Sequence, residues 1–471
     1  MSIRRDYHEA FQTSAAAIGL LPDEADMLWH ICNEPGGYPN YEELRSDSAA
    51  LAAEFDHVDF DPERGIASND QPIGVTAIRG ATNGGAVGYL QGSEHAHELI
   101  AQRTSAKLKR LVAHYPGILD RSGYEKLLIC DHIDPVGESM QEGGSQPSAG
   151  TAEYALNGWR GSWSAYDQIS WAYPTASGQL VRPEIALSLE LLQEARDFFG
   201  SLHGSVFSSY VLVSRQDEAL IADLQHILSN SGLDLNLDLP EAANTLVHAP
   251  GVFDIVNKAH VDESVYAPDI PQEISAKGGG TNALDHIAKG ALMVVPEVAS
   301  IESAAGNEPS GFTRRHAVEM RANMTQAAAA SIDQALGQLN PWLTDNMIQP
   351  RVQRLYNAAA WYREVSAELV QGHLKIIETE ASTGKADVLL SKAKYAQILG
   401  LFATEALMYV GNARRLARQA GNVALQQELT RHIRRGAEII GPTRVVPLSQ
   451  QVAIQSLLAL ASMRHATSAT A

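Results

Sequence analysis

The predicted fold class depends most on residues 386–420, ADVLLSKAKYAQILGLFATEALMYVGNARRLARQA. This segment is rich in Ala, Leu and other residues of high helix propensity, and it contains no proline. Gly421 and Asn422 follow it directly, and both residues are typical of a helix C-terminus. We therefore expect one long helix here.

The rest of the C-terminal third carries the same signals. Further helices are expected at residues 312–339, 350–380, 423–440 and 448–465. Proline marks their limits, because it breaks a helix interior but is tolerated in a first turn. Pro341 and Pro442 are therefore expected stops, and Pro350 is an expected start. Five helices with short connections predict a helical bundle or array.

The first 300 residues are also prone to form helices. These are expected at residues 7–17, 22–32, 42–54, 95–113, 183–199, 216–229 and 282–293. Residues 69–92 and 136–151 are rich in Gly and polar residues, which predicts loops. Only residues 126–133 (KLLICDHI) and 206–213 have β-type character. The chain is thus predicted to be mainly α, with multi-helix domains and a minor β component.

Three regions follow from this pattern. They are a helical and loop-containing N-terminal region (1–135), a mixed central region (136–300) and a C-terminal helical domain (301–471). The net charge of −19 divides unevenly, with −24 in residues 1–300 and +5 in residues 301–471. An acidic body with a basic end favours head-to-tail self-association, or an anionic polymer bound at the basic end.

Composition excludes several classes of protein. The 471 residues hold only Cys32 and Cys130, so neither a disulfide framework nor a cysteine-rich zinc site is expected. No uncharged apolar run of about 18 residues occurs, and the N-terminal MSIRRDYHEAF lacks the apolar core of a secretory signal. We expect an intracellular, cytoplasmic protein without membrane contact.

Two histidines and two carboxylates gather in residues 92–107, GSEHAHELIAQRTSAK. The sequence that follows has helical periodicity, and on a helix His95 and His97 point about 200° apart and cannot share a metal ion. Glu94, His97 and Glu98 would share a face, but acidic residues are common in a first turn, where they suit the helix dipole. We interpret the stretch as a solvated helix start, and predict no metal and no cofactor.

A repeated Asp-His-x-Asp pattern provides the alternative metal site. It occurs at residues 56–59 and 131–134, and in the second copy His132 and Asp134 follow the predicted strand. A His and an Asp two residues apart on a strand face the same side and could bind Mn²⁺ or Mg²⁺. An Asp-Pro pair lies at or near the end of both copies, so turn chemistry explains the same residues and is favoured.

An aromatic cluster occupies residues 157–174, NGWRGSWSAYDQISWAYP. Trp and Tyr near an arginine are the residue types that dominate interface hot spots and that stack on unpaired bases. A local core beneath the preceding loop is an equal alternative. The candidate subunit-interface residues are Trp159, Trp163, Tyr166, Trp171 and Tyr173.

Arginines cluster in two of the predicted C-terminal helices. Guanidinium groups suit phosphates, and a short loop between the two helices could bring both sets to one groove. A solvated face or ion pairs between subunits are the alternatives, and the overall acidity argues against strong non-specific DNA binding. The candidate nucleic-acid contacts are Arg414, Arg415, Arg418, Arg431, Arg434 and Arg435.

These features favour a structural protein over an enzyme, because no specific set of catalytic groups is visible. We predict a self-assembling viral capsid or nucleocapsid protein, located in the virion, with further copies of itself and RNA as partners. The resemblance to α-rich shell and nucleocapsid proteins is in general class only, because no stretch of the sequence matches a family motif. A shell and a helical nucleocapsid fit equally.

Two alternatives remain open. One is a helical adaptor or scaffold protein. The other is a cytosolic metal-dependent hydrolase, whose site would consist of His132 and Asp134 together with Asp56, His57 and Asp59.

Overall fold

The computed structural model describes residues 2–92, 94–141, 150–161, 182–237, 247–254 and 291–467. Its largest feature is a mixed sheet of ten strands. The strands are β1 (Val58–Ile66), β2 (Pro72–Arg79), β3 (Ala86–Gln91), β4 (Tyr124–Cys130), β5 (Phe198–Ser201), β6 (His203–Ser205), β7 (Tyr210–Val213), β8 (Val247–Ala249), β9 (Val252–Asp254) and β10 (Leu292–Ala299). The prediction of a mainly α protein with a minor β component is therefore wrong, and the fold is α/β.

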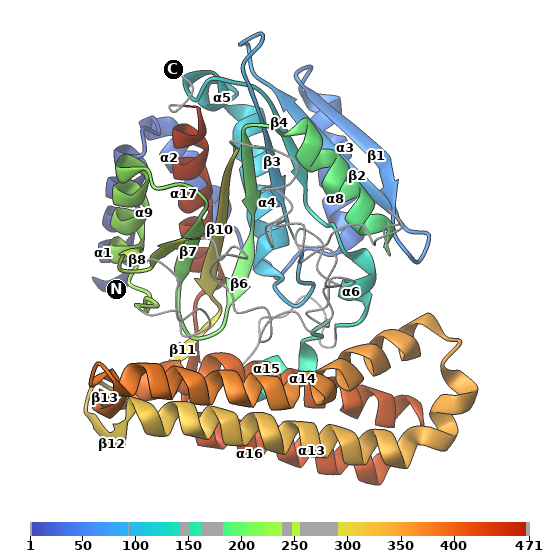
Figure 1. Cartoon of the computed structure of the whole chain (residues 1–471). Helices are drawn as coiled ribbons and strands as arrows, with labels where there is room; N and C mark the ends of the chain where they lie inside the picture. Colours follow the sequence, from blue (N-terminus) through green and yellow to red (C-terminus); the bar gives the residue numbers. More distant parts are fainter. Residues whose placement is uncertain are drawn as a thin grey trace.

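Helices cover both faces of this sheet (Figure 1). They are α1 (Ser2–Ala17), α2 (Pro22–Cys32), α3 (Tyr41–Glu54), α4 (Ile100–His114), α5 (Gly117–Arg121), α6 (Pro135–Ser139), α8 (Pro183–Glu194), α9 (Glu218–Asn230) and α17 (Leu448–Ala466). The short helix α7 (Thr151–Asn157) instead packs against the helices at residues 392–419 and 423–440. Side chains alternate along β4: Leu127 and Ile129 join the core formed with α2, α4, α9 and α17, whereas Leu128 and Cys130 join the core formed with α8. Burial on both faces explains why β4 is a continuous apolar run.

Most of these strands were missed because they lack a strong apolar pattern. The expected loop at residues 69–92 contains β2 and β3, whose short runs are interrupted by Gly74 and Gly88. In the sheet, a Cβ at Gly88 would lie 2.8 Å from the Tyr124 ring and 3.3 Å from the Phe198 ring. Glycine therefore serves close packing here, although in the sequence it suggests a turn.

The sheet order is β1-β2-β4-β3-β5-β10-β7-β9-β8, with β6 paired to β10. Its four central strands, β4, β3, β5 and β10, run parallel to one another. The carboxyl ends of parallel strands meet at one edge of a sheet, where α/β proteins place their ligands. Segments that follow β3, β4 and β5 therefore converge at this edge.

A separate layer of four long helices lies beside the sheet (Figure 1). We call it the helical module; it consists of α13 (Arg314–Asn346), α14 (Pro350–Ala381), α15 (Lys392–Gln419) and α16 (Val423–Ile440). The four corresponding helix predictions are confirmed, apart from their ends. α13 continues past Pro341, and α15 begins only after a 3-10 turn at Lys385–Asp387 and the strand β13 (Leu389–Ser391). Ser391 caps α15 by accepting a hydrogen bond from the Lys394 amide.

Two small sheets complete the module. β12 (Pro309–Thr313) pairs with β13, and β11 (Ile301–Ser303), next to the end of β10, pairs with β14 (Thr443–Val445). The fifth predicted helix, α17, does not join the bundle but packs against α4, α9 and β10. The expected region 301–471 thus contributes to both layers, and the expected boundary at residue 136 lies between two strands of one sheet.

No helix in the described part of the chain is both long enough and apolar enough to cross a bilayer.

Candidate metal centre

The stretch that follows β3 does not form the expected helix start. The amide of Glu98 donates to the carbonyl oxygen of His95 at 2.9 Å, and the amide of Ala101 donates to that of Glu98 at 3.0 Å. The first turn precedes α4, which begins at Ile100, and the second leads into the first residues of that helix. Outside a helix, the angular argument that separated the histidines does not apply, so the prediction of a solvated helix start is wrong.

A third side chain reaches the same place from a distant segment. His203 is the first residue of β6, next to the end of β5, and it lies opposite Glu297 of β10 in the register of the parallel pair. The carboxylate of Glu297 is 3.8 Å from Nδ1 of His203. The parallel strands at the centre of the sheet therefore place both residues at the edge where His95 and Glu98 lie.

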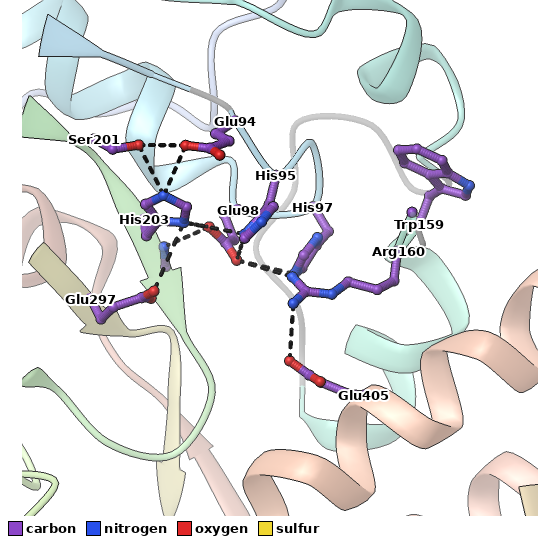
Figure 2. Close-up of polar contacts among 12 residues, drawn as sticks. Glu94, His95, His97, Glu98, Trp159, Arg160, Ser201, His203, Glu297 and Glu405 are labelled. Carbon is purple, nitrogen blue, oxygen red and sulfur yellow. Dashed lines mark hydrogen bonds and ion pairs between the residues drawn. The ribbon is translucent and has the colours of Figure 1, made fainter. Parts of the chain in front are cut away.

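The side chains of His95, Glu98 and His203 converge on one point (Figure 2). Nδ1 of His95 lies 2.9 Å from one Glu98 oxygen, and Nδ1 of His203 lies 2.8 Å from the other. The two Nδ1 atoms are 3.2 Å apart. One ligand atom from each residue falls within 4.8 Å of the others, and within the described ranges this is the one such group of three or more His, Cys, Asp or Glu residues.

This donor set fits a divalent metal ion, zinc in particular. Catalytic zinc takes three protein ligands of the His and Glu type and keeps a fourth position open. Two nitrogens bound tetrahedrally to one zinc ion lie about 3.3 Å apart, close to the observed separation. Two imidazole nitrogens and a carboxylate that face each other need a proton or a cation between them, so the arrangement itself calls for positive charge.

The charges around the site point in the same direction. Burial alone would raise the pKa of Glu98, but the positive charges of His95 and His203 outweigh it and hold that pKa well below its usual value. Burial would lower the pKa of His203, but Glu98 and Glu297 raise it well above its usual value. This buried group of side chains thus favours a cation.

The second nitrogen of His203 is fixed by a polar network. Its Nε2 lies 2.9 Å from Oγ of Ser201 and 3.4 Å from the carboxylate of Glu94. Ser201 donates to Glu94 at 2.7 Å, and Nε2 of Gln91 donates to the same carboxylate at 3.2 Å. A ligating histidine that donates its other N–H to a carboxylate keeps its ring orientation and the correct tautomer. Nδ1 of His203 therefore remains free to bind a metal ion.

Arg160 lies on the opposite side of Glu98. One of its terminal nitrogens is 3.5 Å from the Glu98 carboxylate and 3.2 Å from Nε2 of His97, and the other is 3.2 Å from Glu405 of α15 (Figure 2). Burial is the main cause that lowers the pKa of His97. Glu98 raises this pKa, but Arg160, His95 and His203 lower it further, so it lies well below its usual value. His97 is therefore neutral and lies beside the centre without belonging to the set of three.

The Asp-His-x-Asp segments do not form a metal site. Nδ1 of His132 lies 3.2 Å from Nε2 of Gln102, and its Nε2 lies 3.2 Å from Glu138. Asp134 caps α6 by accepting from the amide of Gly137 and pairs with Arg182 at 2.8 Å, as its interpretation as a turn residue requires. The other segment is at the start of β1, where His57 contacts the Ala113 carbonyl and Asp59 pairs with Arg79.

The six predicted arginine contacts fall into two groups in the structure, one buried and one exposed. Arg414 and Arg415 are buried, and both donate to the carbonyl oxygen of Leu156. These two side chains therefore stabilise the chain's own backbone. The remaining four, Arg418, Arg431, Arg434 and Arg435, are exposed, and their contact with nucleic acid stays a prediction.

The predicted aromatic cluster is described only at its beginning. Trp159 is buried, within the hydrophobic core of the helical module, which agrees with the alternative of a local core at this residue. Trp163, Tyr166, Trp171 and Tyr173 lie outside the described residues.

The sequence did contain a signal for the centre. His95 and Glu98 are three residues apart directly after a buried strand, and His203 opens a further short strand. The helical interpretation of this stretch separates His95 from His97 and gives no reason to pair His95 with Glu98. The third ligand lies 105 residues beyond Glu98, and no local pattern connects them.

Comparison with known proteins shows structural similarity over part of the chain. No protein-family model and no curated protein matches the chain. Among solved structures, it resembles the carboxypeptidase A of Helicoverpa armigera, with 15% identity over 60% of this chain and 71% of that chain, and a TM-score of 0.36. It also resembles a metallo-carboxypeptidase of Pseudomonas aeruginosa, with 13% identity over 54% and 59% of the two chains and a TM-score of 0.32.

A protein of Shewanella denitrificans that is named as a proposed carboxypeptidase A shares 12% identity over 56% of this chain and 60% of that chain, with a TM-score of 0.36. The chain spans less than two thirds of the length of the Shewanella and Pseudomonas proteins. At scores of this size, the functional conclusion depends on the geometry of the site.

That geometry corrects two predictions. The self-assembling capsid or nucleocapsid protein was inferred from a mainly α chain without convergent chemical groups, and both premises are wrong. The expectation that the protein is not an enzyme depended on the same missing site and is wrong for the same reason. The alternative of a metal-dependent hydrolase fits better, although its residues differ from those expected.

Proposed function

We propose that this protein is a metal-dependent hydrolase, with His95, Glu98 and His203 as the ligands of a zinc ion. The observation that carries the proposal is the convergence of two Nδ1 atoms and a carboxylate within 4.8 Å at the carboxyl edge of a parallel sheet. A buried set of three His and Glu ligands is the donor set of hydrolytic zinc sites. When bound, zinc polarises a carbonyl group and lowers the pKa of water to near 7.

Glu297 is the candidate general base. Its carboxylate is 3.8 Å from Nδ1 of His203, so it borders the ligand set, and 14% of its side chain is exposed. A carboxylate in this position can accept a proton from the attacking water molecule and then donate it to the leaving group. It would act first as a general base and then as a general acid.

The neighbouring residues hold the other groups in place. Glu94 and Ser201 fix the ring of His203, while Arg160 restrains the carboxylate of Glu98 from the side away from His203. The substrate class that we propose is an amide bond of a peptide, since polarisation of a carbonyl group and a nearby proton acceptor are what amide hydrolysis requires. The carboxypeptidase names of the structures above make peptides with a free C-terminus the first substrates to test.

The test is reconstitution. The protein is stripped of metal with a chelator, dialysed, and incubated with a mixture of peptides with and without zinc, and the products are followed by mass spectrometry. We expect cleavage only after zinc is added and its loss on renewed chelation. Cleavage that is equally fast without metal, or no cleavage of any peptide by a zinc-loaded protein, would contradict the proposal.

A further inference from the structure

Helix α15 of the helical module holds the segment that carries Arg160. Oη of Tyr409 donates to the carbonyl oxygen of Gly161 at 2.7 Å, and Nδ2 of Asn412 donates to that of Arg160 at 2.8 Å. Arg415 donates to the carbonyl oxygen of Gly158 at 2.9 Å. Side chains along one helix thus bind several carbonyl groups of residues 156–161, which fixes the path of this segment.

The packing between α15 and this segment leaves no room for adjustment. A Cβ at Gly411 would lie 2.5 Å from the carbonyl oxygen of Ala155, and one at Gly158 would lie 2.9 Å from Met408 and 3.5 Å from Cβ of His97. Ala96, between the two histidines, belongs to the same hydrophobic core as Met408. The helical module and the metal centre therefore share one continuous, close-packed core.

A chain of charges crosses this junction. Glu98, a proposed metal ligand, faces Arg160 at 3.5 Å, and Arg160 faces Glu405 of α15 at 3.2 Å. The exposed fractions of the three side chains are 5%, 4% and 23%. Burial alone would lower the pKa of Arg160, but Glu405, Tyr409 and Glu98 raise it, so the guanidinium stays charged.

Arg160 interacts with two carboxylates, and the two interactions have opposite effects on metal binding. Its attraction for Glu98 competes with a metal ion for the same oxygen atoms, whereas its attraction for Glu405 draws the guanidinium toward the helical module. Glu405 thus determines how strongly Arg160 acts on the ligand. Water screens these largely buried charges less than it screens charges at the surface, which strengthens their interaction.

We propose that Glu405 is a positioning residue for the metal centre, which it controls through Arg160, and that the helical module thereby sets the affinity of the α/β sheet for its metal ion. This inference builds on the proposed function, because it takes Glu98 as a ligand. It adds a role for a layer of the molecule that contributes no ligand of its own among the described residues.

The experiment measures the dissociation constant of zinc by competition with a chromophoric chelator. Glu405→Gln removes the charge that draws Arg160 away from Glu98, so zinc should bind more weakly. Replacement of a direct partner of a ligand lowers metal affinity about 10- to 100-fold, and for Glu405, which acts through Arg160, we expect the lower end of this range, about 10-fold. The matched control is Glu428→Gln, the same change at an exposed residue of α16, and its zinc affinity should equal that of the wild type.

A second pair of variants separates this role from general support of the fold. If Glu405 acts through Arg160, adding Glu405→Gln to Arg160→Gln should change the zinc affinity less than about twofold, because the two effects are coupled. If Glu405 had only a structural role, Glu405→Gln would lower the urea midpoint of unfolding but leave the zinc affinity of the folded protein unchanged. The effects of the two substitutions on unfolding would then be independent in the double variant.

The outcomes distinguish the two proposals. A wild-type protein that binds no zinc overturns the proposed function and this inference with it. A wild-type protein that binds zinc, together with a folded Glu405→Gln variant of unchanged affinity, overturns this inference alone.

Discussion

Glu297 and His203 show how the register of two strands creates a pair of chemical groups. They are partners in the parallel pairing of β6 with β10, and both are largely buried. Neither residue has a recognisable sequence context, because their neighbours in space come from segments far apart in the chain. The roles we assign to them, metal ligand for His203 and proton acceptor for Glu297, are separable by mutation.

Replacing Glu297 with Gln should lower the rate of peptide cleavage strongly without removing the metal ion. The amide keeps the size of the side chain but cannot accept a proton from water, and loss of a general base typically costs about 10²- to 10⁴-fold in rate. The measurement is the rate of peptide cleavage alongside zinc content. Full activity in a variant that still holds its zinc would exclude Glu297 as the base.

At the scale of elements, the contact between α15 and α7 depends on Gly411. A methyl group at Gly411 would meet the backbone oxygen of Ala155 at 2.5 Å, and overpacking of this kind costs about 1–3 kcal/mol. We expect Gly411→Ala to lower the free energy of unfolding by this amount in urea titrations.

Gly337 provides the matched control, because it lies inside α13 and a Cβ there meets nothing within 4 Å. Gly337→Ala should stabilise the protein by up to about 1 kcal/mol, the difference in helix propensity between the two residues. Equal effects of the two substitutions would mean that the close approach of α15 to α7 does not exist.

The pairing of α13 with α14 should make the helical module sensitive to acid. Burial, and then the charge of Arg321, holds the pKa of His373 well below its usual value, and Nδ1 of His373 lies 2.9 Å from the guanidinium. Below about pH 6.5 the unfolded chain binds a proton at His373 that the folded chain does not bind, so stability falls as the pH falls.

The measurement for this prediction is urea unfolding at pH 7.5 and pH 5.5. His373 should contribute a loss of about 1.4 kcal/mol between these values, and His373→Gln, which retains an acceptor for Arg321, should remove that part of the loss. An identical pH dependence in the variant would show that His373 takes up its proton equally in both states.

The elements also show what the sequence could reveal. The long helices were predicted to within a few residues, because propensity, caps and prolines agree over many turns, as at α14 and α16. The strands β2 and β3 were not, because their glycines suggest turns and their burial depends on helices elsewhere in the chain. The stretch that holds His95 and Glu98 was noticed, but it was placed on a helix, so the two residues were not recognised as a ligand pair and His203 was not connected with them.

At the scale of the whole molecule, the fold combines an α/β sheet that supplies every proposed ligand with a helical layer that packs against the site. Figure 1 shows the helical module lying across one end of the strands of the sheet. The Glu98–Arg160–Glu405 chain crosses the boundary between them. Metal binding should therefore stabilise both layers, and at a zinc concentration 100-fold above the dissociation constant the gain is about 2.7 kcal/mol.

The most direct test of the central claim is the zinc stoichiometry of the purified protein and of His203→Ala, measured by elemental mass spectrometry after equilibration with zinc and removal of the unbound ion. His226→Ala, a change of the same type on α9, is the control. We predict one zinc ion per chain in the wild type and the control, and none in His203→Ala. A wild type without zinc, or a folded His203→Ala variant that keeps its ion, would contradict the metal centre.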